Sequence, residues 1–127
     1  MGVFLEQKDF LLNNLLNKNL LQKIKNKSIE NLKEEICGLV IESCDGLKFL
    51  QCENLAENKS CNFLIDSNHI IQYDIKYIVH SHILGSSLPS SADKLYCDEI
   101  LIPFLIYSIR YNTFHVYYNN KVTEYKV

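Results

Sequence analysis

The chain has 127 residues, of which 47% are hydrophobic and 22% are charged, and its formal net charge is −2. This length suits one domain with a real hydrophobic core, so we treat residues 1–127 as a single domain. The small net charge argues against bulk electrostatic binding of nucleic acid or of an anionic membrane surface. No apolar run approaches the roughly 18 residues of a membrane span. The N-terminus lacks the basic flank and small-residue cleavage site of a secretory signal.

The cysteines are odd in number and show no Cys-x-x-Cys spacing, which argues against a zinc knuckle or a thioredoxin-like motif. Because most have apolar neighbours, we expect buried, reduced thiols and therefore a reducing, cytoplasmic location. The five are Cys37, Cys44, Cys52, Cys61 and Cys97.

The first half of the chain predicts a leading helix followed by a hairpin. Apolar residues recur at helical spacing over residues 8–25. Residues 28–34 are polar and predict a second short helical turn with Ser28 as its N-cap. The apolar run at residues 36–41 predicts a buried strand. Asp45-Gly46 is a strong hairpin turn signal, so residues 47–52 should return as the next strand.

The second half predicts a sheet with an inserted helix. We expect a short strand at 63–65, a short helix starting at 67–71 and a strand at 75–82. A polar loop at 85–89 leads to a helix that Ser90 opens and that ends before Pro103. Residues 104–110, 113–118 and 122–125 predict three antiparallel strands. The expected fold class is α/β (α+β), with one mixed central sheet flanked by helices.

The motif His80-Ser81-His82 is the most informative stretch for function. Side chains two apart on a strand project to the same face, about 6.6 Å apart along it. Two imidazoles so placed can converge on one metal ion, and Asp93 can arrive from the next element as a third ligand. Three protein ligands and one open position are typical of a catalytic zinc site.

Ser90 and Asp93 also fit a capping box, in which a serine and an acid three residues later satisfy the first backbone amides of a helix. A carboxylate turned back to cap its own helix should bind a metal poorly. Because Asp93 follows the two histidines so closely, we expect it to be a metal ligand. Ser90 can then either cap the helix or point its hydroxyl into the site.

A zinc hydrolase also needs a carboxylate that accepts and delivers a proton. Two acidic residues stand directly before the buried strand that begins at residue 36, and others lie further along the chain. Spacing alone does not choose among them. The candidates are Glu34, Glu35, Glu42, Asp98 and Glu99.

The whole pattern resembles the JAMM motif of the MPN (JAB) metallopeptidases. That motif is a Glu before a hydrophobic-Gly-Leu strand, then His-(Ser/Thr)-His, seven residues, Ser, two residues and Asp. Here it corresponds to Glu35, His80-Ser81-His82, Ser90 and Asp93. The similarity covers roughly residues 30–118. Asn54-Leu55-Ala56, followed by Phe63-x-Ile65, resembles an Asn-x-Ala … Phe-x-Ile segment of the family, and the stretch from residue 92 to residue 108 resembles its bacterial and phage branch.

The resemblance implies an MPN-like (cytidine-deaminase-like) domain that binds one zinc ion and hydrolyses an amide or isopeptide bond. His80, His82 and Asp93 would bind zinc. Glu35 would act as general base and then as general acid, and Ser90 would donate a hydrogen bond to the oxyanion. The expected partner is a peptide or protein substrate. The phage branch further implies association with tail proteins or a separate cysteine peptidase, and a virion-associated alternative to the cytoplasm.

Two alternatives to a peptidase stay open. One is a structural or assembly module of a phage tail that keeps the site but does little chemistry. The other is a non-haem iron centre, since two histidines and a carboxylate also form its facial triad. The chain departs from the family at Ile83, where a proline usually follows the second histidine. Ile cannot fix φ as proline does, so we expect substrate contacts of the following loop to differ.

Overall fold

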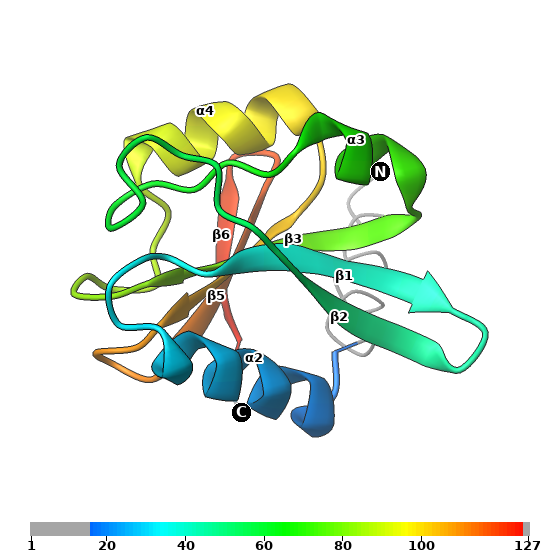
Figure 1. Cartoon of the computed structure of the whole chain (residues 1–127), viewed down its shortest axis with the longest axis horizontal. Coiled ribbons are helices and arrows are strands. Elements are labelled where there is room, and N and C mark those ends of the chain that lie inside the picture. The colour runs from blue at the N-terminus through cyan, green and yellow to red at the C-terminus, as the bar shows by residue number, and fades with distance from the viewer. Residues whose placement is uncertain (1–15, 126–127) are drawn as a thin grey trace.

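The structure is a computed structural model that describes residues 16–125. It is a mixed α+β domain built on one six-stranded sheet, with helices on both faces (Figure 1). The elements in chain order are α2 (Lys18–Glu30), β1 (Cys37–Ser43), β2 (Gly46–Cys52), α3 (Ser67–Gln72), β3 (Ile75–His82), α4 (Ser91–Ile100), β4 (Phe104–Ser108), β5 (Thr113–Tyr118) and β6 (Lys121–Tyr125).

The strands lie in the order β2-β1-β3-β4-β5-β6. Only β3 and β4 run parallel, and α4 forms the crossover between them. The other neighbours are antiparallel, which confirms the hairpin at Asp45-Gly46 and the three antiparallel strands at the C-terminal end. In Figure 1, α2 covers one face of the sheet, and α3 and α4 lie on the other. The strand β3 is therefore central, with its last residues next to the start of α4.

The leading helix differs from its prediction at its C-terminal end. Within the described residues it begins at Lys18, capped by the side chain of Asn17, and it continues to Glu30. Residues 8–15 of the expected helix lie outside the described residues. The expected cap at Ser28 is wrong, because Ser28 is buried inside α2 and its hydroxyl donates to the carbonyl oxygen of Ile24 at 2.7 Å. The Ser28 hydroxyl therefore bonds to the preceding turn of α2 and does not cap a second helix.

The strand expected at residues 63–65 is also wrong. This segment belongs to a loop organised by the buried side chain of Asn54. The Asn54 amide nitrogen donates to the carbonyl oxygens of Glu35 and Asn62, both at 2.9 Å, and its oxygen accepts from the backbone of Leu64. The side chain thus satisfies backbone groups that a strand partner would otherwise bond. The apolar pattern marked burial correctly, since Phe63 is only 7% exposed.

Two hydrophobic clusters fill the space on either side of the sheet. One lies under α2 and includes Leu21, Ile24 and Val40. The other lies under α4 and includes Leu39 and Ile78. All five cysteines are free thiols, but the expectation that most are buried is wrong. Cys37 and Cys97 are buried, Cys52 is half-buried, and Cys44 and Cys61 are exposed, because the last two stand in turns rather than in strands.

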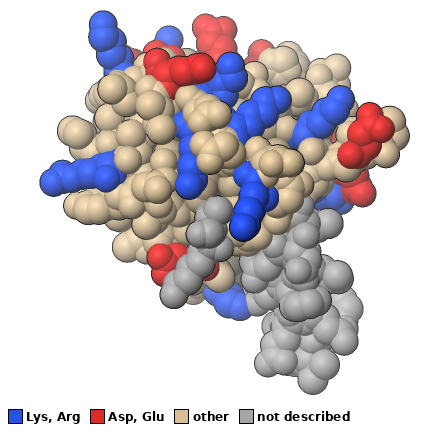
Figure 2. Space-filling view, turned by 90° about the horizontal axis from the view of Figure 1, so that it is seen from below, with Lys and Arg blue, Asp and Glu red and all other residues tan. Residues whose placement is uncertain are grey.

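The outer surface of α2 is polar. Figure 2 shows the face of the molecule on the side of α2, where Lys and Arg side chains outnumber Asp and Glu side chains. Lys18 and Lys23 of this helix are exposed, as expected for a solvated helix face. No helix within residues 16–125 combines the length and apolar character that crossing a membrane requires.

Candidate metal centre

The geometry of the sheet brings three distant parts of the sequence to one point. His80 and His82 are two residues apart on β3, so both project toward the face that α4 covers. In the antiparallel pair β1–β3, Cys37 lies opposite His80. Glu35 is two residues before Cys37 and continues the same face beyond the start of β1. Asp93 is in the first turn of α4, above this corner of the sheet.

Three potential ligand atoms form a compact triangle. His80 Nε2 lies 3.2 Å from His82 Nε2, and Asp93 Oδ2 lies 3.1 Å from the first and 3.0 Å from the second. His80 and Asp93 are buried, and the side chain of His82 is 12% exposed. A tetrahedral zinc ion with bonds of about 2.0–2.1 Å holds its ligand atoms about 3.3 Å apart. The spacing, donor types and one partly open side therefore fit a metal ion of this kind.

A second carboxylate stands at the same place. Oxygen of Glu35 and nitrogens of His80 and His82 lie within 4.8 Å of one another, so this group could also hold a metal ion. Glu35 is 4% exposed, and its Oε1 is one of two buried side-chain atoms in residues 16–125 without a hydrogen-bond partner. An unsatisfied buried oxygen is costly, so its orientation toward a metal site needs a functional reason.

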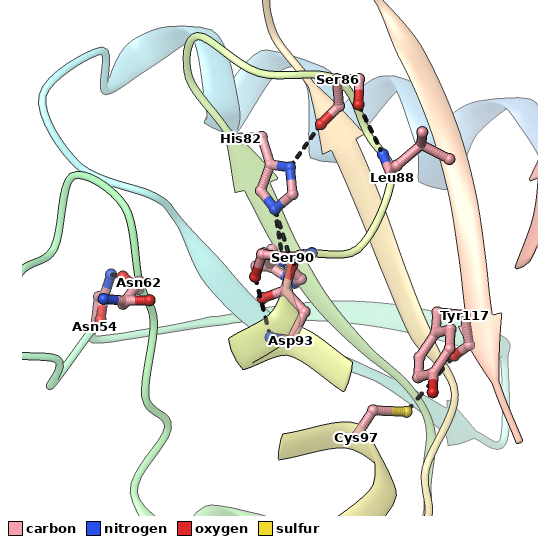
Figure 3. Close-up of polar contacts among 10 residues, drawn as sticks. Asn54, Asn62, His82, Ser86, Leu88, Ser90, Asp93, Cys97 and Tyr117 are labelled. Atoms are coloured by element: carbon pink, nitrogen blue, oxygen red, sulfur yellow. Dashed lines mark hydrogen bonds and ion pairs between the residues drawn. The ribbon is translucent and has the colours of Figure 1, made fainter. Parts of the chain in front are cut away.

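Asp93 both caps its helix and joins the histidines, which corrects our expectation that the two roles exclude each other. Ser90 Oγ accepts from the Asp93 backbone nitrogen at 3.0 Å, and Asp93 Oδ2 accepts from the Ser90 nitrogen at 2.9 Å (Figure 3). The same Oδ2 faces both imidazoles. The capping box therefore orients the carboxylate for the site. Because the Ser90 hydroxyl only accepts in this box, its own proton stays available for another acceptor.

The charges of the site act strongly on one another. Burial lowers the pKa of His80, although the neighbouring Asp93 carboxylate opposes this effect. For His82, burial also acts to lower the pKa, but hydrogen bonds to Asp93 and to the Ser86 carbonyl together with the charge of Asp93 raise it. Burial alone would raise the pKa of Asp93, yet the two histidines hold it well below its usual range. The carboxylate of Asp93 is thus ionised and ready to act as a ligand at any pH near neutrality.

Glu35 responds in the opposite direction. Burial raises its pKa to about 8, against the effect of His82 and with a contribution from the negative charge of Asp93. A carboxyl group with a pKa close to neutrality can both accept and release a proton under ordinary conditions. Two carboxylates in one site with pKa values moved apart are a common sign of separate chemical roles.

The backbone of Glu35 is fixed on both sides. Its amide donates to the carbonyl oxygen of Lys59 at 2.8 Å, and its carbonyl accepts from Asn54. The next residue, Ile36, donates to the hydroxyl of Ser81 at 3.0 Å and accepts from the Ser81 amide at 3.1 Å. The serine between the two histidines therefore ties Glu35 to the histidine strand. This gives a physical reason for a hydroxyl residue at that position.

The loop after His82 is held by polar contacts rather than by a proline. His82 Nδ1 donates to the Ser86 carbonyl oxygen at 2.6 Å (Figure 3), which leaves Nε2 to face the site. Ser108 Oγ donates to the Gly85 carbonyl oxygen at 2.7 Å. Ser87 is fully buried, with its hydroxyl 2.6 Å from His115 Nδ1. These bonds fix three successive loop residues after Ile83.

Sequence reasoning named every ligand candidate but missed the residues that position them. Asn54 stood only in a family-like segment with no assigned role, and Ser87 and His115 had no signal in the sequence. The contact of Phe63 with the site was also missed: its ring stacks on the His80 imidazole with centroids 4.1 Å apart. Their partners are far away along the chain, so spacing could not reveal them.

Comparison with known proteins adds information on the fold alone. The sequence matches no protein-family model, and no curated protein matches it. A similar solved structure is the solution structure of protein DSY2949 from Desulfitobacterium hafniense, with a TM-score of 0.65 and 18% sequence identity. The alignment covers 85% of this chain and 86% of that chain. At this identity the likeness supports the α+β architecture and carries no statement about the site.

Proposed function

We propose that this protein is a zinc-dependent hydrolase of amide or isopeptide bonds, with an MPN-like domain and a JAMM-type site. One observation carries the proposal: Nε2 of His80, Nε2 of His82 and Oδ2 of Asp93 lie 3.0–3.2 Å apart, beside the buried carboxyl of Glu35. The match of the sequence to the motif supports the same assignment independently of this geometry.

In this proposal, His80, His82 and Asp93 would hold the metal. When bound, zinc supplies Lewis acidity, which makes water acidic enough to lose a proton near neutral pH. Glu35 would accept a proton from the attacking water, because its carboxyl is buried beside the two histidines and a bound cation would favour its ionised form. The same group then delivers the proton to the leaving amine, which is the general acid half of the reaction.

Ser90 is suited to stabilise the oxyanion of the tetrahedral intermediate. Its hydroxyl is at the N-terminus of α4, and it lines the same cleft as Glu35 and His82. Because Ser90 Oγ accepts from the Asp93 amide, it can donate its proton toward the substrate oxygen. A single donor of this kind contributes about 10²–10³ in kcat in enzymes where it has been removed.

Metal analysis of the purified protein tests the first half of the proposal. We expect one zinc per chain, and its loss in His80→Ala and in His82→Ala. His69→Ala is the matched control, since His69 is exposed on α3. Iron in place of zinc would favour the facial-triad alternative. Unchanged zinc content in either ligand variant would refute the metal assignment.

The second half is tested with Glu35→Gln. This variant should retain zinc, because the triangle of ligand atoms does not include Glu35, and it should lose hydrolysis of a quenched fluorescent peptide library. A Glu35→Gln protein that lost its zinc would instead point to Glu35 as a ligand. Full activity in the variant would refute its role in proton transfer.

A further inference from the structure

A cleft of about 530 Å³ opens beside the metal centre. Four segments line it: the connection between α2 and β1, the loop before α3, the loop after β3, and the N-terminus of α4. Glu35, His82 and Ser90 belong to its polar part, together with Lys33 and Ser60. Its size falls in the range of about 300–1,000 Å³ that is usual for ligand sites, so it can take part of an extended peptide.

The other part of the cleft is apolar. Leu32, Ile83 and Leu84 line it, and Leu32 and Leu84 are 58% and 74% exposed. Single exposed leucines are ordinary on protein surfaces. Here three aliphatic side chains from two segments border one concave site that also contains a buried, unpartnered carboxyl oxygen within the described region. Binding becomes more favourable when an apolar side chain of a ligand covers this surface and removes it from water.

The charged residues that line the cleft indicate which class of ligand it can bind. Among the described residues that line it, Lys33 is the single lysine or arginine. A polyanion such as a nucleic acid would need a cluster of lysines and arginines, which this lining does not offer. A peptide with an uncharged, apolar residue suits it better.

We propose that this cleft binds a bulky aliphatic or aromatic side chain of the substrate, next to the bond that is hydrolysed. Leu32, Ile83 and Leu84 are the specificity-determining residues of this subsite. The inference rests on the proposed amide hydrolase function and adds the class of substrate to it. Ile83 stands where the family that the motif resembles usually has proline, so this part of the subsite differs from that family.

Gly85 offers a way to fill the cleft without disturbing the fold. It lines the cleft, and a Cβ atom built on it meets no other atom within 4 Å. A phenylalanine at this position should occupy the cleft from its edge. Leu95 provides a matched control for the leucines, because it is 73% exposed on α4 and does not line the cleft.

The test measures binding of fluorescein-labelled hexapeptides of glycine and alanine to the full-length, zinc-loaded Glu35→Gln protein. One residue is varied among Leu, Phe, Ala and Ser at each of the six positions in turn. We expect one position at which Leu or Phe binds about 10-fold tighter than Ser. Leu32→Ser and Leu84→Ser should reduce this preference several-fold, Gly85→Phe should shift it toward Ala, and Leu95→Ser should leave it unchanged.

Hydrolysis of the same peptides by the protein with Glu35 intact separates this inference from the proposed function. Equal affinity for Leu and Ser peptides at all positions overturns the apolar subsite, even if the peptides are cleaved. A preference that survives in Leu32→Ser, Leu84→Ser and Gly85→Phe also overturns it. Selective binding without any cleavage overturns the hydrolase function and retains the apolar subsite.

Discussion

Replacing Glu35 by Gln should stabilise the metal-free protein at alkaline pH. In the unfolded chain this carboxyl has its ordinary pKa of 4.5, whereas burial in the folded protein raises the pKa to about 8. Between these two values the folded protein holds a proton that the unfolded chain has released. Stability therefore falls as pH rises through this interval. Glutamine has nearly the same shape and stays neutral, so the variant lacks this loss.

The magnitude follows from the two pKa values. Their separation of roughly 3.5 pH units, at about 1.4 kcal/mol per unit, sets an upper limit of about 5 kcal/mol. At pH 5 the two proteins should differ little in their free energy of unfolding. From about pH 5.5 to pH 7.5 the difference should grow by about 1.4 kcal/mol per pH unit, the slope of one proton, in favour of the variant.

Urea denaturation of chelator-treated protein at half-unit steps from pH 5 to pH 8.5 measures this difference. Subtracting the two stabilities at each pH cancels the pH dependence that the histidines contribute equally to both proteins. Adding zinc should shrink the difference, because a nearby cation favours the ionised carboxylate. A difference that stays constant with pH, or a variant less stable than the parent at pH 8, would refute the reasoning.

Other changes test how the site is supported. Gly38→Ala would place a Cβ atom in a clash with the backbone carbonyl oxygen of Leu50 on β2, so we expect the free energy of unfolding in urea to fall by about 3 kcal/mol or more. Gly85→Ala, where a Cβ atom meets nothing, should change it by no more than about 0.5 kcal/mol. Asn54→Ala removes four hydrogen bonds of a buried side chain and should lower the melting temperature. Asn54→Asp should lower it as well, because a carboxylate oxygen cannot donate to the carbonyl oxygens of Glu35 and Asn62. Ser87→Ala frees the loop that fixes His82, and we expect zinc affinity, measured by chelator competition, to fall about 10-fold while the circular dichroism spectrum is unchanged. Unaltered affinity would show that this loop is held without the serine.

The local features of the site could be read from the sequence because they depend on regular geometry over a few residues. Alternation along β3 places His80 and His82 on one face, and the spacing of Ser90 and Asp93 is that of a capping box. The hairpin at Asp45-Gly46 follows from turn chemistry in the same way. Each of these depends on backbone preferences that operate over a few neighbouring residues.

Tertiary structure decided what those residues meet. Glu35 reaches the histidines only because β1 pairs with β3 across more than forty residues of sequence, and Asn54 then fixes its carbonyl. The Asn54 side chain also accepts from the amide of Leu64, while Leu55 N donates to the Leu64 carbonyl oxygen and Tyr96 Oη accepts from the amide of Ile65, so residues 63–65 form a loop and not the predicted strand. That Asp93 can cap α4 and face both imidazoles at once depends on where the helix packs on the sheet. Packing and long-range pairing set these distances, and no local pattern contains them.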